Sequence, residues 1–490
     1  MKRLIALLLL TCVLGGLLCG CATGNMPTDT SVKEPDQGTL AGTEAALDIP
    51  DDRYDDQQLI FLTREDGEWG TVEIFAPDGS GDNISNAVFE RNDMIKQKYG
   101  VDIAEFRQGS DKHQNTVNLE VSAPTGDFQV IVSSVTSTSN MVMNNLLVDL
   151  NSGENLFLET EKPWWDSKFA KGTEIDGKLF FVTGDIMTLD NDATFAIMFN
   201  KGLAKDVNLP DLYSMVKNQS WTMDKMYEFA QLAKSDENGD GRLDYKGDIS
   251  GFAYTVDTPY CILYAGGVQV VGANDQDDLV YALDIDRTQS IVEMSRLLLN
   301  SAYSTNLNGN SDGAPIVEAG KTCFGGGYAL FFGECLQCVT RLRSYETEFG
   351  ILPYPMYDSH QDGYRSLMHS TGSVVSIPRS IEGSDQIDMV TSMLEAMACY
   401  SVSTLTKQYY EINLKSKGAH DAESAEMIDL IIGNRACDLA YYYGWGEVVK
   451  NLSGALLPGS GTSVASSSAN YKRNVEKSIE RLISTINKSK

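Results

Sequence analysis

The chain has 490 residues, of which 42% are hydrophobic and 9% aromatic, and its net charge is −29 at pH 7. A charge of this sign and size argues against nucleic acids and anionic membrane surfaces as partners, because both would repel the protein. The length exceeds what a single hydrophobic core normally serves, so we expect two lobes or domains.

The N-terminus has the pattern of a bacterial export signal. Two basic residues precede an apolar stretch, residues 4–18, that is too short to span a membrane. The stretch ends in LCGC (residues 18–21), which resembles the lipobox of bacterial lipoproteins. We therefore expect residues 1–20 to be a signal peptide and Cys21 to carry the acyl chains that anchor the protein to the outer face of the cytoplasmic membrane. An ordinary signal peptide ending in small residues is the alternative.

The next segment, residues 21–57, is predicted to be a flexible tether. It is poor in large apolar residues and rich in Thr, Asp, Gly and Pro, so it cannot bury enough surface to become ordered. No later apolar run approaches 18 residues, and we expect the rest of the chain to lie outside the bilayer.

Strand and helix patterns alternate after the tether. Apolar runs predict strands at residues 58–62, 101–106 and 128–132, and residues 85–99 have a helical pattern that stops at Gly100. Such alternation predicts mainly parallel sheets with helices on their faces. Apolar residues at helical spacing predict two further helices, at residues 223–233 and 475–486. The run GSGTSVASSS, residues 459–468, is either a flexible loop or a strip of small residues near the surface.

The segment SDENGDGRLDYKGD (residues 235–248) resembles the first half of a calcium loop. Asp236, Asn238 and Asp240 take positions one, three and five of an EF-hand count, but position twelve is Gly247 where a sensor needs a bidentate Glu. The pattern therefore excludes a calcium sensor and leaves open a structural Ca²⁺ or a solvated turn. The candidate calcium ligands are Asp236, Asn238, Asp240, the carbonyl of Arg242, Asp244 and Asp248.

The sequence contains no recognised catalytic motif. Its four histidines are scattered, and GxSxG, HExxH and P-loop patterns are absent, so we expect no catalytic residues and no required cofactor. Cys335 and Cys338 have CxxC spacing without a second pair, which favours free thiols over a zinc site or a redox pair.

Four segments, taken in order, resemble one protein family. FAIMFNKGLAKDVNL (195–209), followed by SWTMD (220–224), resembles the strand, Asn-Lys, helix and Trp-Thr segment of extracellular solute-binding proteins of bacterial ABC importers. EFGILPYPMYD (348–358) resembles the Gly-x-x-Pro-x-Pro strand of that family, and KTCFGGGYAL (321–330) a crossing between lobes. The similarity is to family 1, the carbohydrate-type branch that includes the maltose-binding protein, and it extends from about residue 58 to the C-terminus.

The resemblance implies a two-lobed, type II periplasmic-binding-protein fold with a ligand cleft between α/β lobes. It implies a first lobe of residues 58–190 with 323–373 and a second lobe of residues 191–322 with 374–490. The implied function is to capture a solute, expected to be a carbohydrate or oligosaccharide, by hinge closure and to deliver it to membrane permease subunits. We expect a monomer that is not an enzyme. A lipid-anchored carbohydrate-active enzyme and a structural or adhesive lipoprotein are the alternatives.

Sugar sites combine aromatic rings, which stack on apolar sugar faces, with carboxylates and amides that bind hydroxyls. Asp190 and Asp192 are expected at the first lobe crossing, and the rings of Tyr328 and Phe331 beside the second. Trp445 is expected in a Gly-flanked loop that leaves its ring accessible. For each ring the alternative is a place in the hydrophobic core. The candidate ligand-binding residues are Asp190, Asp192, Tyr328, Phe331, Trp445, Tyr443, Trp165 and Tyr260.

Overall fold

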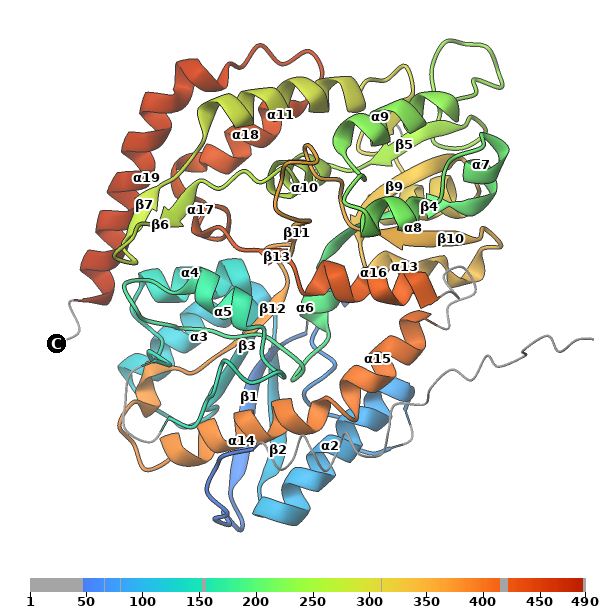
Figure 1. Ribbon diagram of the computed structural model, residues 1–490. Helices are drawn as coiled ribbons and strands as arrows, with labels where there is room; N and C mark the ends of the chain where they lie inside the picture. Colours follow the sequence, from blue (N-terminus) through green and yellow to red (C-terminus); the bar gives the residue numbers. More distant parts are fainter. Residues whose placement is uncertain are drawn as a thin grey trace, which may run out of the picture.

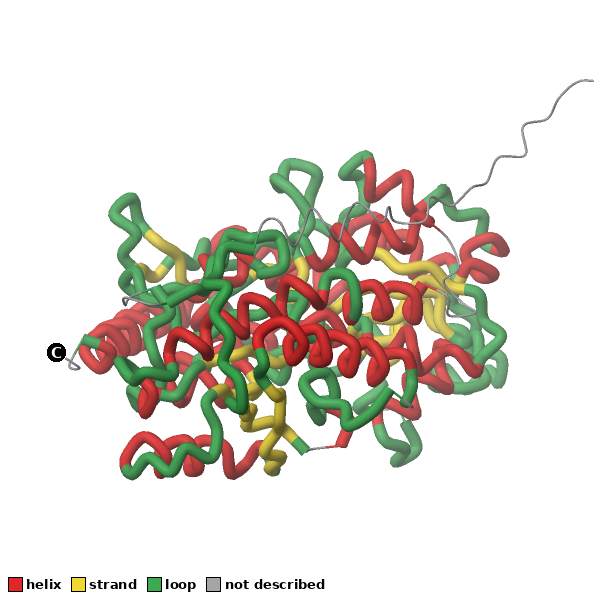
Figure 2. The backbone as a smooth tube through the Cα atoms, turned by 90° about the horizontal axis from the view of Figure 1, so that it is seen from below, coloured by secondary structure: helices red, strands yellow, loops and turns green. Residues whose placement is uncertain are grey.

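The computed structural model describes residues 47–487, except residues 66, 80, 152–155, 310 and 415–421. The predicted signal peptide and Cys21 lie outside this range, so both the peptide and lipid attachment stay predictions. Two mixed β-sheets, each flanked by helices, form two lobes that lie one above the other in Figure 1. The view from below in Figure 2 shows helices surrounding the strands. Within the described residues, no helix is both long enough and apolar enough to cross a membrane.

The first lobe contains a four-stranded sheet of order β12-β3-β1-β2. β1 is parallel to β2 and β3, and β12 runs antiparallel to β3. Its strands are β1 (Gln58–Arg64), β2 (Asp102–Gln108), β3 (Val130–Ser134) and β12 (Ser373–Ser376), and its helices are α2 (Asn83–Tyr99), α3 (Ser110–Ser122), α4 (Val135–Met143), α5 (Ser167–Thr173), α14 (Ile387–Ser401) and α15 (Leu405–Leu414), with the short helices η1 (Gly67–Trp69) and η4 (Arg379–Ile381).

The second lobe contains a five-stranded sheet of order β10-β4-β9-β5-β8. β4 is antiparallel to β9 and β10, whereas β5 is parallel to β8 and β9. Its strands are β4 (Phe195–Asn200), β5 (Ser250–Tyr254), β8 (Ser304–Asn306), β9 (Ala329–Cys335) and β10 (Phe349–Leu352), with a separate hairpin of β6 (Val271–Ala273) and β7 (Leu279–Tyr281).

Helices cover both faces of the second sheet (Figure 1). α19 begins at Val464 because the side chain of Ser463 caps it, so the second half of the loop predicted at 459–468 is helical. The helices are α7 (Lys201–Asp206), α8 (Leu212–Lys217), α9 (Met223–Leu232), α10 (Thr258–Ala265), α11 (Ile285–Leu298), α12 (Ile316–Gly320), α13 (Gln337–Arg341), α16 (Ala422–Ile432), α17 (Leu439–Tyr442), α18 (Val448–Leu456) and α19 (Val464–Ile486), with the short helices η2 (Lys321–Gly325), η3 (Leu342–Ser344) and η5 (Trp445–Glu447).

Strand residues alternate between two hydrophobic clusters in each sheet. In β4, Ile197 and Phe199 join the cluster on one face, and Ala196 and Met198 join the cluster on the other. This alternation follows from the two-residue period of a strand, and it explains why the strand reads as a continuous apolar run.

The division between lobes differs from the one expected. Residues 323–373 were assigned to the first lobe, but β9 and β10 pair with β4 in the second sheet. Conversely, β12 pairs with β3, and α14 packs on α2 in the first lobe. The Gly-rich segment at 321–330 therefore leads into a central strand of the second sheet, where side chains on both faces are buried, and it makes no crossing between lobes.

The last part of the predicted tether is ordered. Leu47, Ile49 and Tyr54 pack against the core of the first lobe, and the backbone N–H of Tyr54 donates to the carbonyl of Tyr99 at 2.7 Å. The three apolar side chains supply the buried surface that the composition of the whole segment seemed to lack. From Leu47 onward the chain is therefore part of the first lobe.

The acidic turn at 235–248 is held by its own side chains. The two carboxylate oxygens of Asp236 accept the backbone N–H groups of Gly239 and Gly241 at 2.7 and 2.8 Å. The carboxylate of Asp248 accepts those of Glu237 and Asp244 at 2.9 and 2.8 Å. Within the described residues, no group of three or more His, Cys, Asp or Glu side chains is arranged to hold a metal ion.

Calcium binding by this turn stays a prediction. If the oxygens of Asp236, Asn238 and Asp240 converge on an ion, millimolar calcium is expected to raise the melting temperature of the wild type but not of Asp240→Ala, because the substitution removes one ligand. Thermal unfolding in calcium and in chelator measures the difference. Identical wild-type curves would leave only a solvated turn.

The six cysteines from Cys261 to Cys437 are free thiols, and five of them are buried. Cys335 and Cys338 both lie in the core of the second lobe. Burial raises the pKa of the Cys335 thiol well above its ordinary value, so this thiol is held in its unreactive form.

Candidate ligand-binding site

The two lobes are joined where several chain segments lie side by side. The first crossing contains the short helix α6 (Leu189–Asp192), which leads into Ala193. The backbone N–H of His369, in the second crossing, donates to the carbonyl of Ala193 at 2.8 Å. Just before His369, strand β11 (Ser366–Leu367) pairs in parallel with β13 (Arg435–Ala436). These segments form the hinge region, and the remaining connection, between α15 and α16, lies outside the described residues.

Both sheets direct the carboxyl ends of parallel strands toward this junction. β1 ends at Arg64 in the first lobe, and its guanidinium donates to the carbonyl of Thr371 in the second crossing at 2.9 Å. β5 ends at Tyr254 in the second lobe, just before Asp257. In open α/β sheets, ligands bind in the crevice outside the carboxyl ends of the strands.

His369 links the two lobes at this place. Its ring stacks on Trp69 of the first lobe, with centroids 6.1 Å apart and planes at 10°. Its Nε2 lies 3.6 Å from the Oδ1 of Asp257 in the second lobe. Its edge meets Phe195 at a centroid distance of 5.7 Å. A solute between the lobes would therefore meet groups from both of them.

A cavity of about 350 Å³ opens beside His369, and we call it the cleft. The rings of Tyr260 and Tyr441 in its wall are 5.6 Å apart, and at its rim Lys450 pairs with Glu447 at 3.2 Å. The lining residues are Asp257, Tyr260, His369, Ser370, Ala440, Tyr441, Gly444, Glu447, Val449 and Lys450. Two aromatic faces with carboxylate, imidazole and hydroxyl groups suit a polyhydroxylated ring.

A second carboxyl group, that of Glu334 in β9, lies near the cleft residues Asp257 and His369. Burial raises its pKa, hydrogen bonds from Cys335 oppose the shift, and the charge of Asp257 adds to it.

The fold matches solved structures of solute-binding proteins at low sequence identity. The GacH receptor of Streptomyces glaucescens, solved unliganded and with acarbose, aligns with a TM-score of 0.53 and 13% identity over 86% of this chain and 98% of its own. An ABC substrate-binding protein of Listeria monocytogenes in complex with cycloalternan aligns with a TM-score of 0.54 and 10% identity, over 87% of this chain and 100% of its own. The MalE domain of Bdellovibrio bacteriovorus bound to maltotriose aligns with a TM-score of 0.52 and 12% identity, over 86% of this chain and 100% of its own. The chain has the fold of the type II periplasmic binding proteins.

No protein-family model and no curated protein matches the chain. The periplasmic-binding-protein fold confirms the expected class of two α/β lobes flanked by helices. The expectation of mainly parallel sheets is only partly met, since each sheet also contains antiparallel pairs.

Among the candidate ligand-binding residues, Tyr260 lines the cleft beside His369. Trp445 and Tyr443 do not, because they pack on each other with centroids 5.4 Å apart and border a separate cavity between α4 and α19. The ring of Trp445 was expected to be accessible, but the residue is 4% exposed. The helix α19 covers it, although the neighbouring glycines had suggested an open loop.

Two further candidate rings belong to the second lobe. Phe331 is fully buried in β9, where its ring meets Trp221 at a centroid distance of 5.5 Å. Tyr328 packs against the cluster on the opposite face of the sheet. Neither borders the cleft, because Phe331 lies in a central strand of the sheet and Tyr328 directly precedes that strand.

The remaining candidates lie in the first lobe or in the first crossing. Trp165 donates its indole N–H to Glu395 at 2.8 Å, and Trp164 donates to the other oxygen of the same carboxylate at 2.8 Å. Asp190 is buried and pairs with Arg435 at 2.8 Å. Asp192 lies beside it, and burial raises the pKa of its carboxyl to about 7. Trp165 therefore lies in the core of the first lobe, whereas Asp190 and Asp192 lie in the first crossing, and none of the three borders the cleft.

Asp257 and His369, which line the cleft, and Trp69, which stacks on His369, were not among the candidates from the sequence. Asp257 follows β5 and Trp69 follows β1, so the rule about carboxyl ends of strands could have found both. His369 precedes an antiparallel strand and carries no such signal. Its position depends on pairing between segments about 175 residues apart in the chain, His369 and Ala193.

The buried carboxyls at the hinge predict a pH dependence of stability. Burial raises the pKa of Asp185 and of Asp192 to about 7, and the charge of Glu73 adds to the shift at Asp192. Since these values lie above those of an unfolded chain, the folded state binds the protons more tightly. The free energy of unfolding should therefore fall as pH rises from about 4 to about 7 and then level off.

Asp192→Asn imitates the protonated side chain and is expected to reduce this fall by about 1.4 kcal/mol per pH unit. Urea unfolding of both proteins at pH 5.5 and 7.5 measures the change. An unaltered slope would show that Asp192 is ionised in the folded protein throughout this range.

Proposed function

We propose that the chain is the substrate-binding lipoprotein of an ABC importer, which captures an extracellular carbohydrate or oligosaccharide by closure of its two lobes. The cleft beside His369 is the observation that carries the proposal, because His369 lines it and contacts both Trp69 of the first lobe and Asp257 of the second. The fold supports it, since the similar structures include proteins solved with acarbose, cycloalternan and maltotriose. A solute held between the lobes would stabilise their closed arrangement.

Binding without turnover is the activity we propose for the cleft. The cavity of about 350 Å³ is near the lower end of the usual range for ligand pockets, which suits a small saccharide or one end of a longer chain. A lipid-anchored carbohydrate-active enzyme and an adhesive surface lipoprotein are the alternatives, and we know of no feature of the cleft that favours either. The solute would pass from the closed protein to permease subunits in the membrane.

A melting-temperature screen against mono- and oligosaccharides tests the proposal on protein lacking the N-terminal segment. A ligand at 100 times its Kd is expected to stabilise the fold by about 2.7 kcal/mol. Stabilisation by one glycan class, with the glycan recovered unchanged, supports an importer component. Release of a product would favour the enzyme, and no response to any sugar would remove the carbohydrate assignment.

The proposal includes an anchor at Cys21. Cys21→Ala is expected to release the protein from membranes and to leave solute affinity unchanged, because the cleft is built from residues after position 57. Fractionation after a carbonate wash measures the release. Retention of the variant in the membrane fraction would contradict lipidation at this cysteine.

A further inference from the structure

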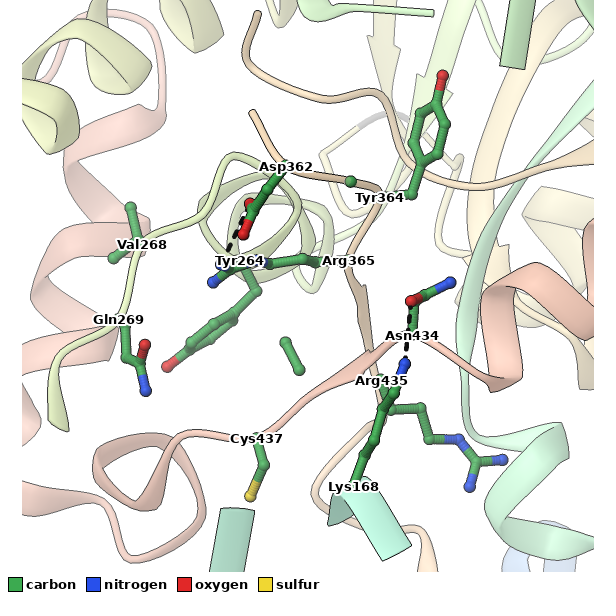
Figure 3. A pocket seen from close by; sticks show the side chains of 12 residues that line it. Lys168, Tyr264, Val268, Gln269, Asp362, Tyr364, Arg365, Asn434, Arg435 and Cys437 are labelled. Carbon is green, nitrogen blue, oxygen red and sulfur yellow. Dashed lines mark hydrogen bonds and ion pairs between the residues drawn. The ribbon is translucent and has the colours of Figure 1, made fainter. Parts of the chain in front are cut away.

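A second cavity, of about 290 Å³, lies on the other side of the aromatic wall of the cleft, and we call it the hinge cavity (Figure 3). Tyr260 and Tyr264 are one turn apart in α10, and the first lines the cleft while the second lines the hinge cavity. The ring of Tyr441 contacts both, at centroid distances of 5.6 and 5.8 Å. The two cavities are therefore neighbours separated by tyrosine side chains.

The hinge cavity has cationic groups from different parts of the molecule. Lys168 comes from α5 of the first lobe, and Arg365 comes directly before β11 of the hinge region. Arg435 is also in the lining, but its guanidinium already pairs with Asp166 and Asp190 at 3.0 and 2.8 Å. This basic lining is unusual in a chain with 39 basic and 68 acidic residues.

The two outer cations have no close carboxylate among the partners that the described residues give them: Lys168 binds neutral oxygens, and the carboxylate beside Arg365 is distant. Lys168 donates to the carbonyl of Gly433 at 2.5 Å and to the Oδ1 of Asn434 at 3.2 Å, which are neutral oxygens. Arg365 lies 3.8 Å from a carboxylate oxygen of Asp362, whose side chain is 87% exposed. An ion pair this long and this exposed to water contributes little to stability, so another anion can replace Asp362. In Figure 3, Arg365 extends into the middle of the cavity, and Lys168 rises from below with its ammonium group toward Asn434.

We propose that the hinge cavity binds a small oxyanion, a phosphate or a carboxylate, between Lys168 and Arg365. A guanidinium presents a planar fork that matches two oxygens of such an anion, and an ammonium adds a compact charge. The amide group of Gln269 in the same lining can donate to a remaining oxygen. The overall negative charge opposes binding only weakly, because charges more than about 8 Å away are screened at physiological ionic strength.

Binding in the hinge cavity is linked to the arrangement of the lobes. Lys168 belongs to the first lobe, whereas Arg365 and Gln269 follow elements of the second. An anion that contacts both groups favours the lobe arrangement that brings them together. By linkage, a solute in the cleft that favours the same arrangement and the anion must raise each other's affinity.

Titration calorimetry with sodium phosphate and with sodium citrate, against sodium chloride at matched ionic strength, tests the site without any knowledge of the solute. Saturable binding of either oxyanion is expected in the wild type. Arg365→Gln should weaken it about tenfold, because the charge-assisted hydrogen bonds of the fork are lost. Asp362→Asn should strengthen it about two- to threefold, because the competing carboxylate is removed. Lys225→Gln, which removes an exposed cation paired with Glu228 on α9, should have no effect.

Binding of phosphate alone would identify a phosphate site, and binding of citrate alone a carboxylate site. The proposal is overturned if neither anion binds more than chloride does, or if Arg365→Gln and Lys225→Gln reduce binding equally. Weaker binding by Asp362→Asn would also overturn it. If Arg365→Gln melts well below the wild type, anion binding by Lys168→Gln, measured in the same way, tests the site from the other side of the cavity.

Discussion

Arg435→Met is expected to lower the free energy of unfolding by about 3–5 kcal/mol, because it leaves a buried carboxylate without its cation. The guanidinium donates to Asp166 at 3.0 Å, to Asp190 at 2.8 Å and to the hydroxyl of Thr194 at 3.1 Å, and it also bonds Asn191. The side chains of Arg435 and Asp190 are both 1% exposed. Methionine fills much of the volume but offers no donor, so the loss is mainly electrostatic.

Two comparisons separate this effect from a general loss of packing. Lys171→Met breaks an exposed ion pair with Glu174, and it should cost less than about 1 kcal/mol. Asp190→Asn combined with Arg435→Met should recover part of the loss, because no uncompensated carboxylate remains at that position. Equal losses in Arg435→Met and in the double variant, measured by urea unfolding, would contradict the electrostatic account.

The loss in Arg435→Met should also depend on pH. Burial raises the pKa of Asp190, and Arg435 opposes that shift in the wild type. Without the arginine, the pKa of Asp190 in the folded state rises further above its value in the unfolded state. The folded state therefore binds the Asp190 proton more tightly over a wider pH range. The stability deficit of the variant should therefore be smaller at pH 5 than at pH 8.

The sequence predicted the local elements of this fold well. The helix expected at 85–99 is α2, because Asp82 caps its start and Gly100, with φ of 77°, ends it. The strands at 58–62 and 128–132 were predicted from continuous apolar runs, which occur because side chains on both faces of the sheet are buried. These signals lie within a few residues of the elements that they determine.

Long-range pairing was much harder to predict. The neighbour of β3 is β12, about 240 residues later, and no local pattern in Ser373–Ser376 shows which sheet it joins. The same limit applied to ligand-binding residues. Trp445 has glycines on both sides, which suggested an open loop, but its burial depends on a helix that begins at Val464. Exposure of a ring is set by distant segments, whereas a strand or helix is set by adjacent ones.

Trp69→Ala is expected to weaken binding of the solute identified in the melting screen by roughly 30-fold or more. Ring truncation at the centre of a binding site commonly costs about 2 kcal/mol or more, and 1.4 kcal/mol corresponds to tenfold. The ring of Trp69 comes from the first lobe and stacks on His369, which lines the cleft. Tyr260→Ala should have an effect of similar size from the second lobe, because its ring lines the cleft directly.

Trp445→Ala is the matched control, because it removes the same side chain from outside the cleft. Trp445 is 4% exposed and packs on Tyr443, so its truncation should lower the free energy of unfolding by about 3–5 kcal/mol and leave solute affinity nearly unchanged. Calorimetric titration together with urea unfolding separates the two kinds of loss. If Trp445→Ala weakened binding while Trp69→Ala and Tyr260→Ala bound normally, the solute would lie between α4 and α19, and the cleft beside His369 would not be its site.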